Sequence, residues 1–194
     1  MKTSLNGRKF IESFEGLILQ SYDDYNDHIV NEGDTVHGTI TIGYGHTTAA
    51  GNPSVFLGMR VTREEADQIL GQDLGRVEQE INNLVKVPLN QNQFDALVSF
   101  HFNTGALGHS SALVLLNEGK YAEAADHLLL YNKAGNKVLA GLIRRRKAEY
   151  ELFMSQATTL PDTSKKLTSD APTQSWNTIV DYYWNLILNL FKRK

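Results

Sequence analysis

Near the N-terminus the sequence changes from a helical pattern to a pattern of short strands and turns, and this change limits the possible folds more than any other feature. Residues 4–20 place apolar side chains at helical spacing, whereas residues 21–48 are rich in Asp, Asn, Gly, Thr and aromatic residues. Within that second segment, residues 39–43 alternate between threonine or glycine and isoleucine, which predicts short β-strands joined by turns. Helical patterns return over residues 62–155. The sequence therefore predicts an α+β domain, with a small antiparallel β-sheet segregated from a mostly helical lobe.

Caps and breakers divide the helical part. Thr62, with Glu65 three residues later, forms a capping box that starts a long helix running through Leu84 and ending before Pro88. Shorter helices are expected over residues 90–102, 110–118, 121–130 and 142–155.

The last 39 residues of the 194 differ from the rest. Residues 156–175 are polar and hold two of the four prolines, which is typical of a linker. Residues 176–194 repeat apolar side chains at i, i+3, i+4 and i+7, with Asn and Asp on the opposite face. We expect a domain over 1–155, a linker over 156–175 and an amphipathic basic C-terminal helix over 176–194.

The charge follows the same division. The net charge is −3, but residues 1–155 hold nineteen acidic and fourteen basic residues, whereas the C-terminal helix ends in Lys-Arg-Lys. Tryptophans on the apolar stripe and a basic end suit an anionic membrane or outer-membrane surface. Docking on the chain's own domain or on a second copy is the alternative. We expect no nucleic-acid partner, because the body is acidic.

Several features exclude other classes of protein. The absence of cysteine excludes disulfides, thiolate metal sites and a cysteine nucleophile. The six histidines are scattered, without the helical spacing of metal ligands, so no metal site is expected. The N-terminus is followed by no apolar run of signal-peptide length, and no stretch of 18 uninterrupted apolar residues occurs. We therefore expect synthesis in the cytoplasm without a signal peptide.

Two carboxyl groups in contrasting surroundings indicate acid–base chemistry. Glu15 lies among apolar residues near the end of the first predicted helix, where desolvation raises the pKa of a carboxyl, as a general acid requires. Asp24 lies in a polar turn and should stay ionised, and Thr41 faces away from Ile40 and Ile42 on its strand. This contrast suits glycoside hydrolysis. From spacing alone, a solvated glutamate and an ordinary turn aspartate explain the pattern better.

Several separated motifs resemble the phage-type lysozymes (endolysins) of glycoside hydrolase family 24. The motifs are Phe14-Glu15-Gly16-Leu17, Tyr22-Asp23-Asp24, Thr39 to Thr47, and segments 90–100, 102–105, 132–135 and 141–146. They follow the family's order and cover about residues 5–155. The resemblance implies a lysozyme-like fold and a muramidase that cuts the β-1,4 bond between N-acetylmuramic acid and N-acetylglucosamine in peptidoglycan, without metal or cofactor.

The resemblance also implies roles for the carboxyl groups. Glu15 matches the family's general acid, and Asp24 and Thr41 match the residues that position the attacking water, with inversion. Sixteen residues separate Asp24 from Thr41, more than in short-loop members. We therefore expect residues 25–38 to form a longer hairpin or flap. Asp23 is a neighbouring acid, so the assignment of Asp24 rests on its alignment after Tyr22.

Further residues match the family's saccharide cleft. The expected substrate contacts are Asn103, Asn132, Lys133, Arg144 and Arg145. The alternative for Asn103 is that it only ends a helix. The alternative for Asn132 and Lys133 is that they are ordinary loop residues. One of the consecutive arginines 144–146 should pair with Glu15, and spacing does not say which. His46 is expected to pair structurally with an acid on the following helix, with Asp73 as the candidate.

Two other functions are alternatives, although Asp24 and Thr41 argue against the first. A lytic transglycosylase would keep the acid but close an anhydro ring without water, and a catalytically silent module would only bind peptidoglycan or disturb membranes. For an enzyme without a signal peptide, the resemblance implies a holin-type pore made by another protein. The enzyme would then act on the cell wall or in the periplasm after release.

Overall fold

The structure is a computed structural model that describes residues 1–155. The linker predicted over residues 156–175 and the amphipathic helix predicted over 176–194 lie outside the described residues. Among residues 1–155, no helix is both long and apolar enough to cross a bilayer.

Helices make up most of the described chain. They are α1 (Leu5–Glu12), α2 (Arg63–Leu84), α3 (Gln91–Thr104), α4 (Ser111–Asn117), α5 (Tyr121–Leu128) and α6 (Ala140–Met154), with short 3-10 turns at Thr48–Ala50 and Leu107–His109. The strands are β1 (Ile18–Asp23), β2 (His28–Ile29), β3 (Ile40–Gly43), β4 (His46–Thr47), β5 (Lys133–Ala134) and β6 (Lys137–Val138).

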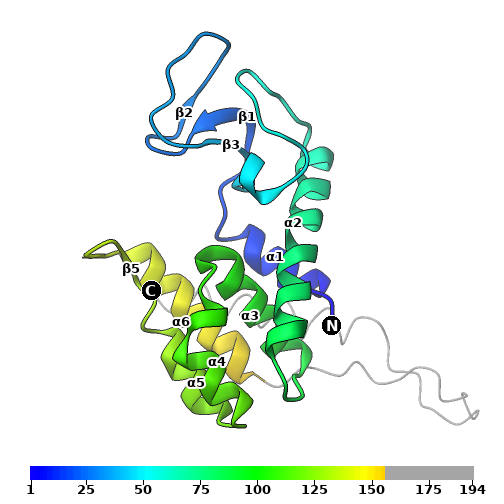
Figure 1. Ribbon diagram of the computed structural model, residues 1–194, viewed down its shortest axis with the longest axis vertical. Helices are drawn as coiled ribbons and strands as arrows, with labels where there is room; N and C mark the ends of the chain where they lie inside the picture. The colour runs from blue at the N-terminus through cyan, green and yellow to red at the C-terminus, as the bar shows by residue number, and fades with distance from the viewer. Residues whose placement is uncertain (156–194) are drawn as a thin grey trace, which may run out of the picture. The chain divides into compact units, whose positions relative to one another are not determined.

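The sheet and the helices are segregated, which confirms the predicted α+β class. Strands β2, β1, β3 and β4 form one antiparallel sheet in that order, and β5 pairs with β6 in a separate hairpin. In Figure 1 the larger sheet lies at one end of α2, and α3, α4, α5 and α6 gather around the other end. The helix α2 thus connects a sheet lobe with a helical lobe.

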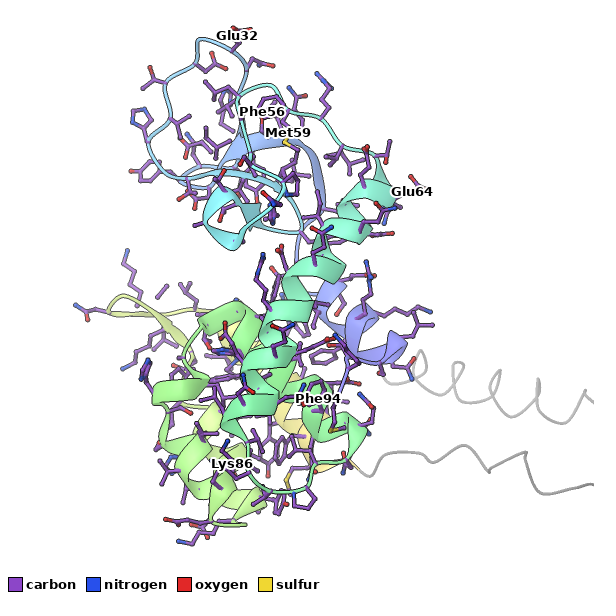
Figure 2. The ribbon with its side chains drawn as sticks, turned by 45° about the vertical axis from the view of Figure 1, so that its right-hand side comes forward. Glu32, Phe56, Met59, Glu64, Lys86 and Phe94 are labelled. Carbon is purple, nitrogen blue, oxygen red and sulfur yellow. The ribbon has the colours of Figure 1, made fainter. Side chains whose placement is uncertain are left out.

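The predicted capping box sets the start of α2. The Thr62 hydroxyl accepts the N–H of Glu65 at 3.1 Å, and the Glu65 carboxylate accepts the N–H of Thr62 at 2.7 Å. Figure 2 places Glu64 beside the sheet lobe and Lys86 just beyond the other end of the helix. Local sequence therefore fixes where this connecting helix begins.

The core lies in the helical lobe around α3. Phe94, Leu97 and Phe100 on this helix are each at most 1% exposed. Helix α6 packs along α3, and α4 packs against α5. Phe94 lies deep within this lobe in Figure 2. The amphipathic faces predicted for these helices meet here.

The first helix is shorter than its periodicity predicts. The prediction extends it over residues 4–20, but α1 ends at Glu12 and the chain becomes strand β1 at Ile18. Ile18 lies opposite Gly43 of β3, so strand pairing uses side chains that also fit a helical period. As a result, Glu15 lies in the connection between a helix and the sheet rather than on a helix.

A buried aspartate closes the neck of the long loop that follows β1. Asp23 is 2% exposed, and its carboxylate accepts the N–H groups of Tyr25 at 3.1 Å, His37 at 2.7 Å and Gly38 at 2.8 Å. A Cβ atom at Gly38 would collide with the carboxylates of Asp23 and Asp24. Residues 25–38 therefore leave and return at one clamped point, and part of them pairs with β1 as β2.

The structure corrects smaller boundaries in the helical lobe. Residues 132–138, expected as loop, form the β5–β6 hairpin, whose tip is Gly135 with a φ of 56°. Helix α6 begins at Ala140, two residues earlier than its periodicity predicts. The hairpin was not predicted because the paired residues of β5 and β6 show no strong strand pattern in the sequence.

Asp23→Asn should lower the melting temperature at neutral pH by several degrees. Hydrogen bonds from the backbone, above all that of His37, hold the pKa of Asp23 below its usual value, against the effect of burial. The carboxylate therefore stabilises the fold above the ordinary aspartate pKa of about 3.9, and this contribution disappears as the pH falls through the lowered pKa.

Melting curves of wild type and variant from neutral to acidic pH would check this prediction. The gap between the two should be widest near neutrality and close in acid. Asp27→Asn, in an exposed position of the same loop, serves as the control and should melt like the wild type. A difference in melting temperature that does not depend on pH would contradict the proposed role of the Asp23 charge.

Candidate active site

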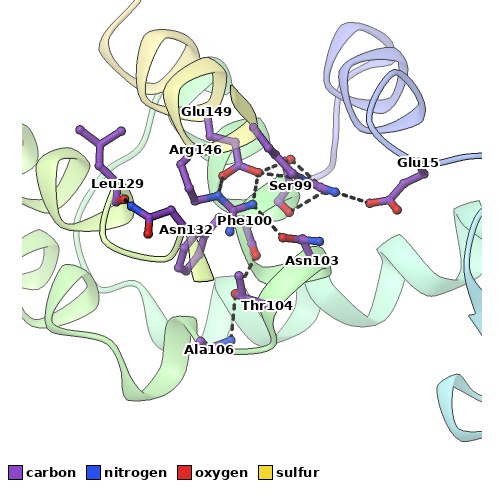
Figure 3. A network of polar contacts seen from close by, with 11 residues as sticks. Glu15, Ser99, Phe100, Asn103, Thr104, Ala106, Leu129, Asn132, Arg146 and Glu149 are labelled. Atoms are coloured by element: carbon purple, nitrogen blue, oxygen red, sulfur yellow. Dashed lines mark hydrogen bonds and ion pairs between the residues drawn. The ribbon is translucent and has the colours of Figure 1, made fainter. Parts of the chain in front are cut away.

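Glu15 lies where the two lobes join, between α1 and β1. Its side chain is 19% exposed, and its Oε1 accepts a hydrogen bond from Nη1 of Arg145 at 2.5 Å. Figure 3 shows Glu15 reaching toward the arginine cluster of α6 from a separate segment of the chain. The arginine expected to pair with Glu15 is therefore Arg145.

The guanidinium of Arg145 is held on several sides. Its Nε donates to Oε1 of Glu149 at 3.1 Å, and its Nη2 donates to the carbonyl oxygen of Ser99 at 3.2 Å. The ring centroid of Phe14 lies 5.5 Å from its central carbon, within cation–π range. With a side chain 5% exposed, Arg145 offers Glu15 a fixed, buried donor.

The other two arginines have different surroundings, as their spacing of about 100° per residue on a helix requires. Arg146 is 1% exposed and donates from Nη2 to Oδ1 of Asn103 at 3.0 Å. Its guanidinium also lies 5.1 Å from the ring centroid of Phe100. Burial lowers the pKa of Arg146, which nearby Glu149 opposes. Arg144 is exposed.

Glu149, which the sequence reasoning missed, holds both buried arginines. It is fully buried, and its Oε1 accepts hydrogen bonds from Ser99 Oγ at 2.7 Å and from Arg146 Nη2 at 2.9 Å. Desolvation raises the pKa of this carboxyl, whereas Arg146, Ser99 and Arg145 oppose the rise. Its spacing of three and four residues from the arginines is the signal that could have found it.

Three hollows meet around Glu15 and Asn103. The first, of about 440 Å³, is lined by Ser13, Phe14, Glu15, Asn103, Leu139, Gly141, Leu142, Arg144 and Arg145. The second, of about 340 Å³, is lined by Glu15, Tyr44, Gly45, Ala50, Asp73, Arg76, Val77, Glu80, Phe102 and Asn103. The third, of about 450 Å³, is lined by Asn103, Thr104, Ala106, Tyr131, Lys133, Ala134, Leu139 and Leu142. Together they form a cleft that contacts both lobes.

Asp24, directly after β1, and Thr41, on β3, both contact Thr39 and lie outside the linings of these three hollows. Asp24 is exposed, and its Oδ1 accepts the N–H of Thr39 at 2.6 Å. Thr41 is 3% exposed and donates its hydroxyl proton to the carbonyl oxygen of Thr39 at 3.1 Å. Thr41 is buried because β3 is an inner strand with buried residues on both faces.

The charges of both candidate carboxylates, Glu15 and Asp24, influence the pKa of Tyr22. Burial raises the pKa of Tyr22, and the charges of Asp27, Asp24 and Glu15 raise it further. Tyr22 also lies opposite Thr41 in the sheet register. The charges of both candidate carboxylates therefore act on Tyr22, whose register partner in the sheet is Thr41.

The remaining predicted contacts divide into two kinds. Lys133 lines the third hollow, and Arg144 lines the first. Asn132 instead donates from Nδ2 to the carbonyl oxygen of Leu129 at 3.0 Å, at the end of α5 (Figure 3). This side chain thus has a helix-ending contact of its own.

His46 has the structural role that its position predicts. Its Nδ1 lies 2.8 Å from Oδ2 of Asp73, and its Nε2 lies 2.8 Å from the carbonyl oxygen of Pro53. The ring is buried. Among residues 1–155, no three His, Asp or Glu side chains converge in a way that could hold a metal ion.

Comparison with known sequences places the chain in one family. The phage lysozyme family profile matches residues 12–149. The endolysin of Salmonella phage P22 is 42% identical over 157 residues, which cover 80% of this chain and 99% of that protein. The endolysin of Bacillus phage B103 is 36% identical over 174 residues, 85% of this chain and 61% of that protein.

Solved structures agree with the sequence comparison. The muramidase domain of SpmX from Asticaccaulis excentricus superposes with a TM-score of 0.68 at 42% identity, over 80% of this chain and 99% of that one. A mutant of P22 lysozyme superposes with a TM-score of 0.66 at 40% identity, with the same coverage. The chain belongs to the phage lysozyme family and is a glycoside hydrolase that acts on peptidoglycan.

Proposed function

We propose that this enzyme is a muramidase that cleaves the β-1,4 bond between N-acetylmuramic acid and N-acetylglucosamine with inversion, using Glu15 as general acid. The observation that carries the proposal is the position of Glu15. Its carboxyl is partly exposed at the point where two hollows meet, while Arg145 holds it from the buried side. A group so placed can reach a glycosidic oxygen of a polymer lying in the cleft.

The reaction then follows from the two carboxyl groups. Glu15 donates its proton to the leaving glycosidic oxygen as the bond to the anomeric carbon breaks. A water positioned by Asp24 and Thr41 attacks that carbon from the opposite face of the sugar and passes its proton to Asp24. The product carries a new reducing end. The exposed carboxylate of Asp24, next to the neck clamped by Asp23, supports this role.

We propose that several side chains along the hollows contact the glycan. Asn103 lines all three hollows, and its Oδ1 is fixed by Arg146. The position of its amide supports a hydrogen bond to a sugar. Lys133 and Arg144 each add a cation at the wall of one hollow. Arg145 contributes through Glu15, and Asn132 contributes by supporting the neighbouring hairpin.

Glu15→Gln should reduce the rate of bond cleavage at least about 100-fold, which is typical for the loss of a general acid. The amide keeps the size of the side chain and can still accept the hydrogen bond from Arg145. The melting temperature should therefore stay close to that of the wild type. Release of reducing ends from purified peptidoglycan measures the rate.

Glu12→Gln is the matched control, because Glu12 lies three residues away and pairs with Arg8 on the surface of α1. It should cleave like the wild type. Anhydro products from the wild type would indicate a lytic transglycosylase. Wall lysis that survives Glu15→Gln would indicate a module that acts without catalysis.

Asp24→Asn should lower the same rate about 100-fold, because the amide cannot take the proton of the attacking water. Its side-chain oxygen can still accept the N–H of Thr39, so the fold should be kept. Asp34→Asn, in the same loop, is the control and should keep its activity. Full activity of Asp24→Asn would mean that another acidic residue accepts the proton of the attacking water.

From the sequence, we propose that residues 176–194 bind an anionic membrane or outer-membrane surface. The apolar stripe with its tryptophans and the basic end support this proposal. We propose further that the enzyme is made in the host cytoplasm and reaches the wall through a holin-type pore made by another protein.

Deleting residues 176–194 should leave cleavage of purified peptidoglycan within about twofold and weaken killing of intact cells, because surface attraction is lost. A full-length variant with the three terminal cations changed to Gln separates charge from the apolar stripe. It should show part of the loss. Equal killing of intact cells by the truncated and full-length enzymes would refute the proposal.

A further inference from the structure

Glu149 is a buried carboxylate that touches none of the hollows described above. Its Oε1 accepts three hydrogen bonds, from Ser99 Oγ, Arg145 Nε and Arg146 Nη2, and its Oε2 lies 2.7 Å from Arg146 Nε. Its side chain is 0% exposed. A charge this deep is costly to bury unless it is paired and hydrogen-bonded. The folded enzyme holds it by using two arginines and a serine from two different helices.

The contacts of Arg145 leave one nitrogen for the active site. Nε donates to Glu149, Nη2 donates to Ser99, and Nη1 donates to Glu15 (Figure 3 shows the acceptors). A guanidinium is planar and rigid, so two fixed nitrogens also fix the direction of the third. The position of the Nη1–H bond on which Glu15 rests therefore depends on Glu149.

The same carboxylate also balances charge. Arg145, Arg146, Glu15 and Glu149 share the cluster, so its formal charge is zero when Glu15 is ionised and +1 when Glu15 carries the proton that it donates. Without Glu149, two buried cations would face one glutamate. Nearby positive charge favours the ionised form of a carboxyl group, which is the wrong form for a general acid.

We infer that Glu149 is a positioning residue for catalysis, which acts through Arg145 to hold the Glu15 carboxyl in the cleft and offsets the charge of Arg146 beside it. The inference rests on the proposed role of Glu15 as general acid. Glu149 itself does not touch the substrate.

Other charged and titratable groups also face Glu15, and none of them is altered in the test. Tyr44, Asp73, Arg76 and Glu80 line one hollow with Glu15, Arg144 lines the other, and the charge of Glu15 acts on Tyr22 of β1. A change in the pH dependence of a Glu149 variant can therefore be assigned to the cluster.

Glu149→Gln tests the charge. The cluster gains one positive charge beside the proposed general acid, so activity on the alkaline side should fall. The alkaline limb of kcat/KM, measured by release of reducing ends from purified peptidoglycan, should move to lower pH by about half to one unit. A purely structural role would lower the melting temperature and leave the limb in place.

Glu149→Asp tests the geometry and protects the experiment against a misfolded amide variant. It keeps the counter-ion of the arginines but withdraws the carboxylate by one methylene from Arg145 Nε. We expect kcat to fall about tenfold, with KM and the alkaline limb close to the wild type. A wild-type kcat in this variant would overturn the inference, whether or not Glu149→Gln folds.

Asp95→Asn is the matched control. Asp95, on α3, is 1% exposed. Its carboxylate accepts the N–H of Ser4, the N-cap of α1, and does not contact the arginine cluster. Its amide variant should lose stability but keep the alkaline limb. An equal shift of the limb in this control, or no shift in folded Glu149→Gln, would overturn the inference. If Glu15→Gln still abolishes cleavage in that case, the proposed function stands and only the role of Glu149 falls.

Discussion

The ion pair between Arg145 and Glu15 is the interaction on which the site depends, because it joins the two lobes of the enzyme. Glu15 lies in the connection that leads into the sheet, and Arg145 lies on α6, 130 residues later. The pair places a carboxyl at the junction of two hollows while its donor stays buried. Since the donor is itself held by Glu149 and Ser99, the position of Glu15 depends on the packing of α6 against α3.

The sheet lobe holds the exposed carboxylate of Asp24 next to the long loop of residues 25–38. Asp23 collects three N–H groups from both ends of the loop, and Asp24 takes the N–H of Thr39. Two adjacent aspartates thus divide into a buried clamp and an exposed carboxylate. A longer loop is tolerated here because its ends are tied at one point, and the cost of closing a loop grows slowly with its length.

Local patterns predicted much of the helical lobe. The capping box at Thr62, the asparagine cap before α3 and the serine cap before α4 are short-range hydrogen bonds, so the starts of these helices could be placed from the sequence. The first helix was placed wrongly because residues 18–20 satisfy a helical period as well as a strand. Pairing with distant β3 decides between the two, and no local rule contains that contact.

The sequence by itself determined the class of fold, the family resemblance and the identity of the candidate acid, because these depend on residue types in a fixed order. Only the tertiary structure decided which arginine reaches Glu15, that Thr41 is buried, and that Glu149 unites the arginines. Three consecutive arginines look alike in a sequence. They differ in the fold because a helix turns each by about 100°, so one faces the cleft acid, one the core and one the solvent.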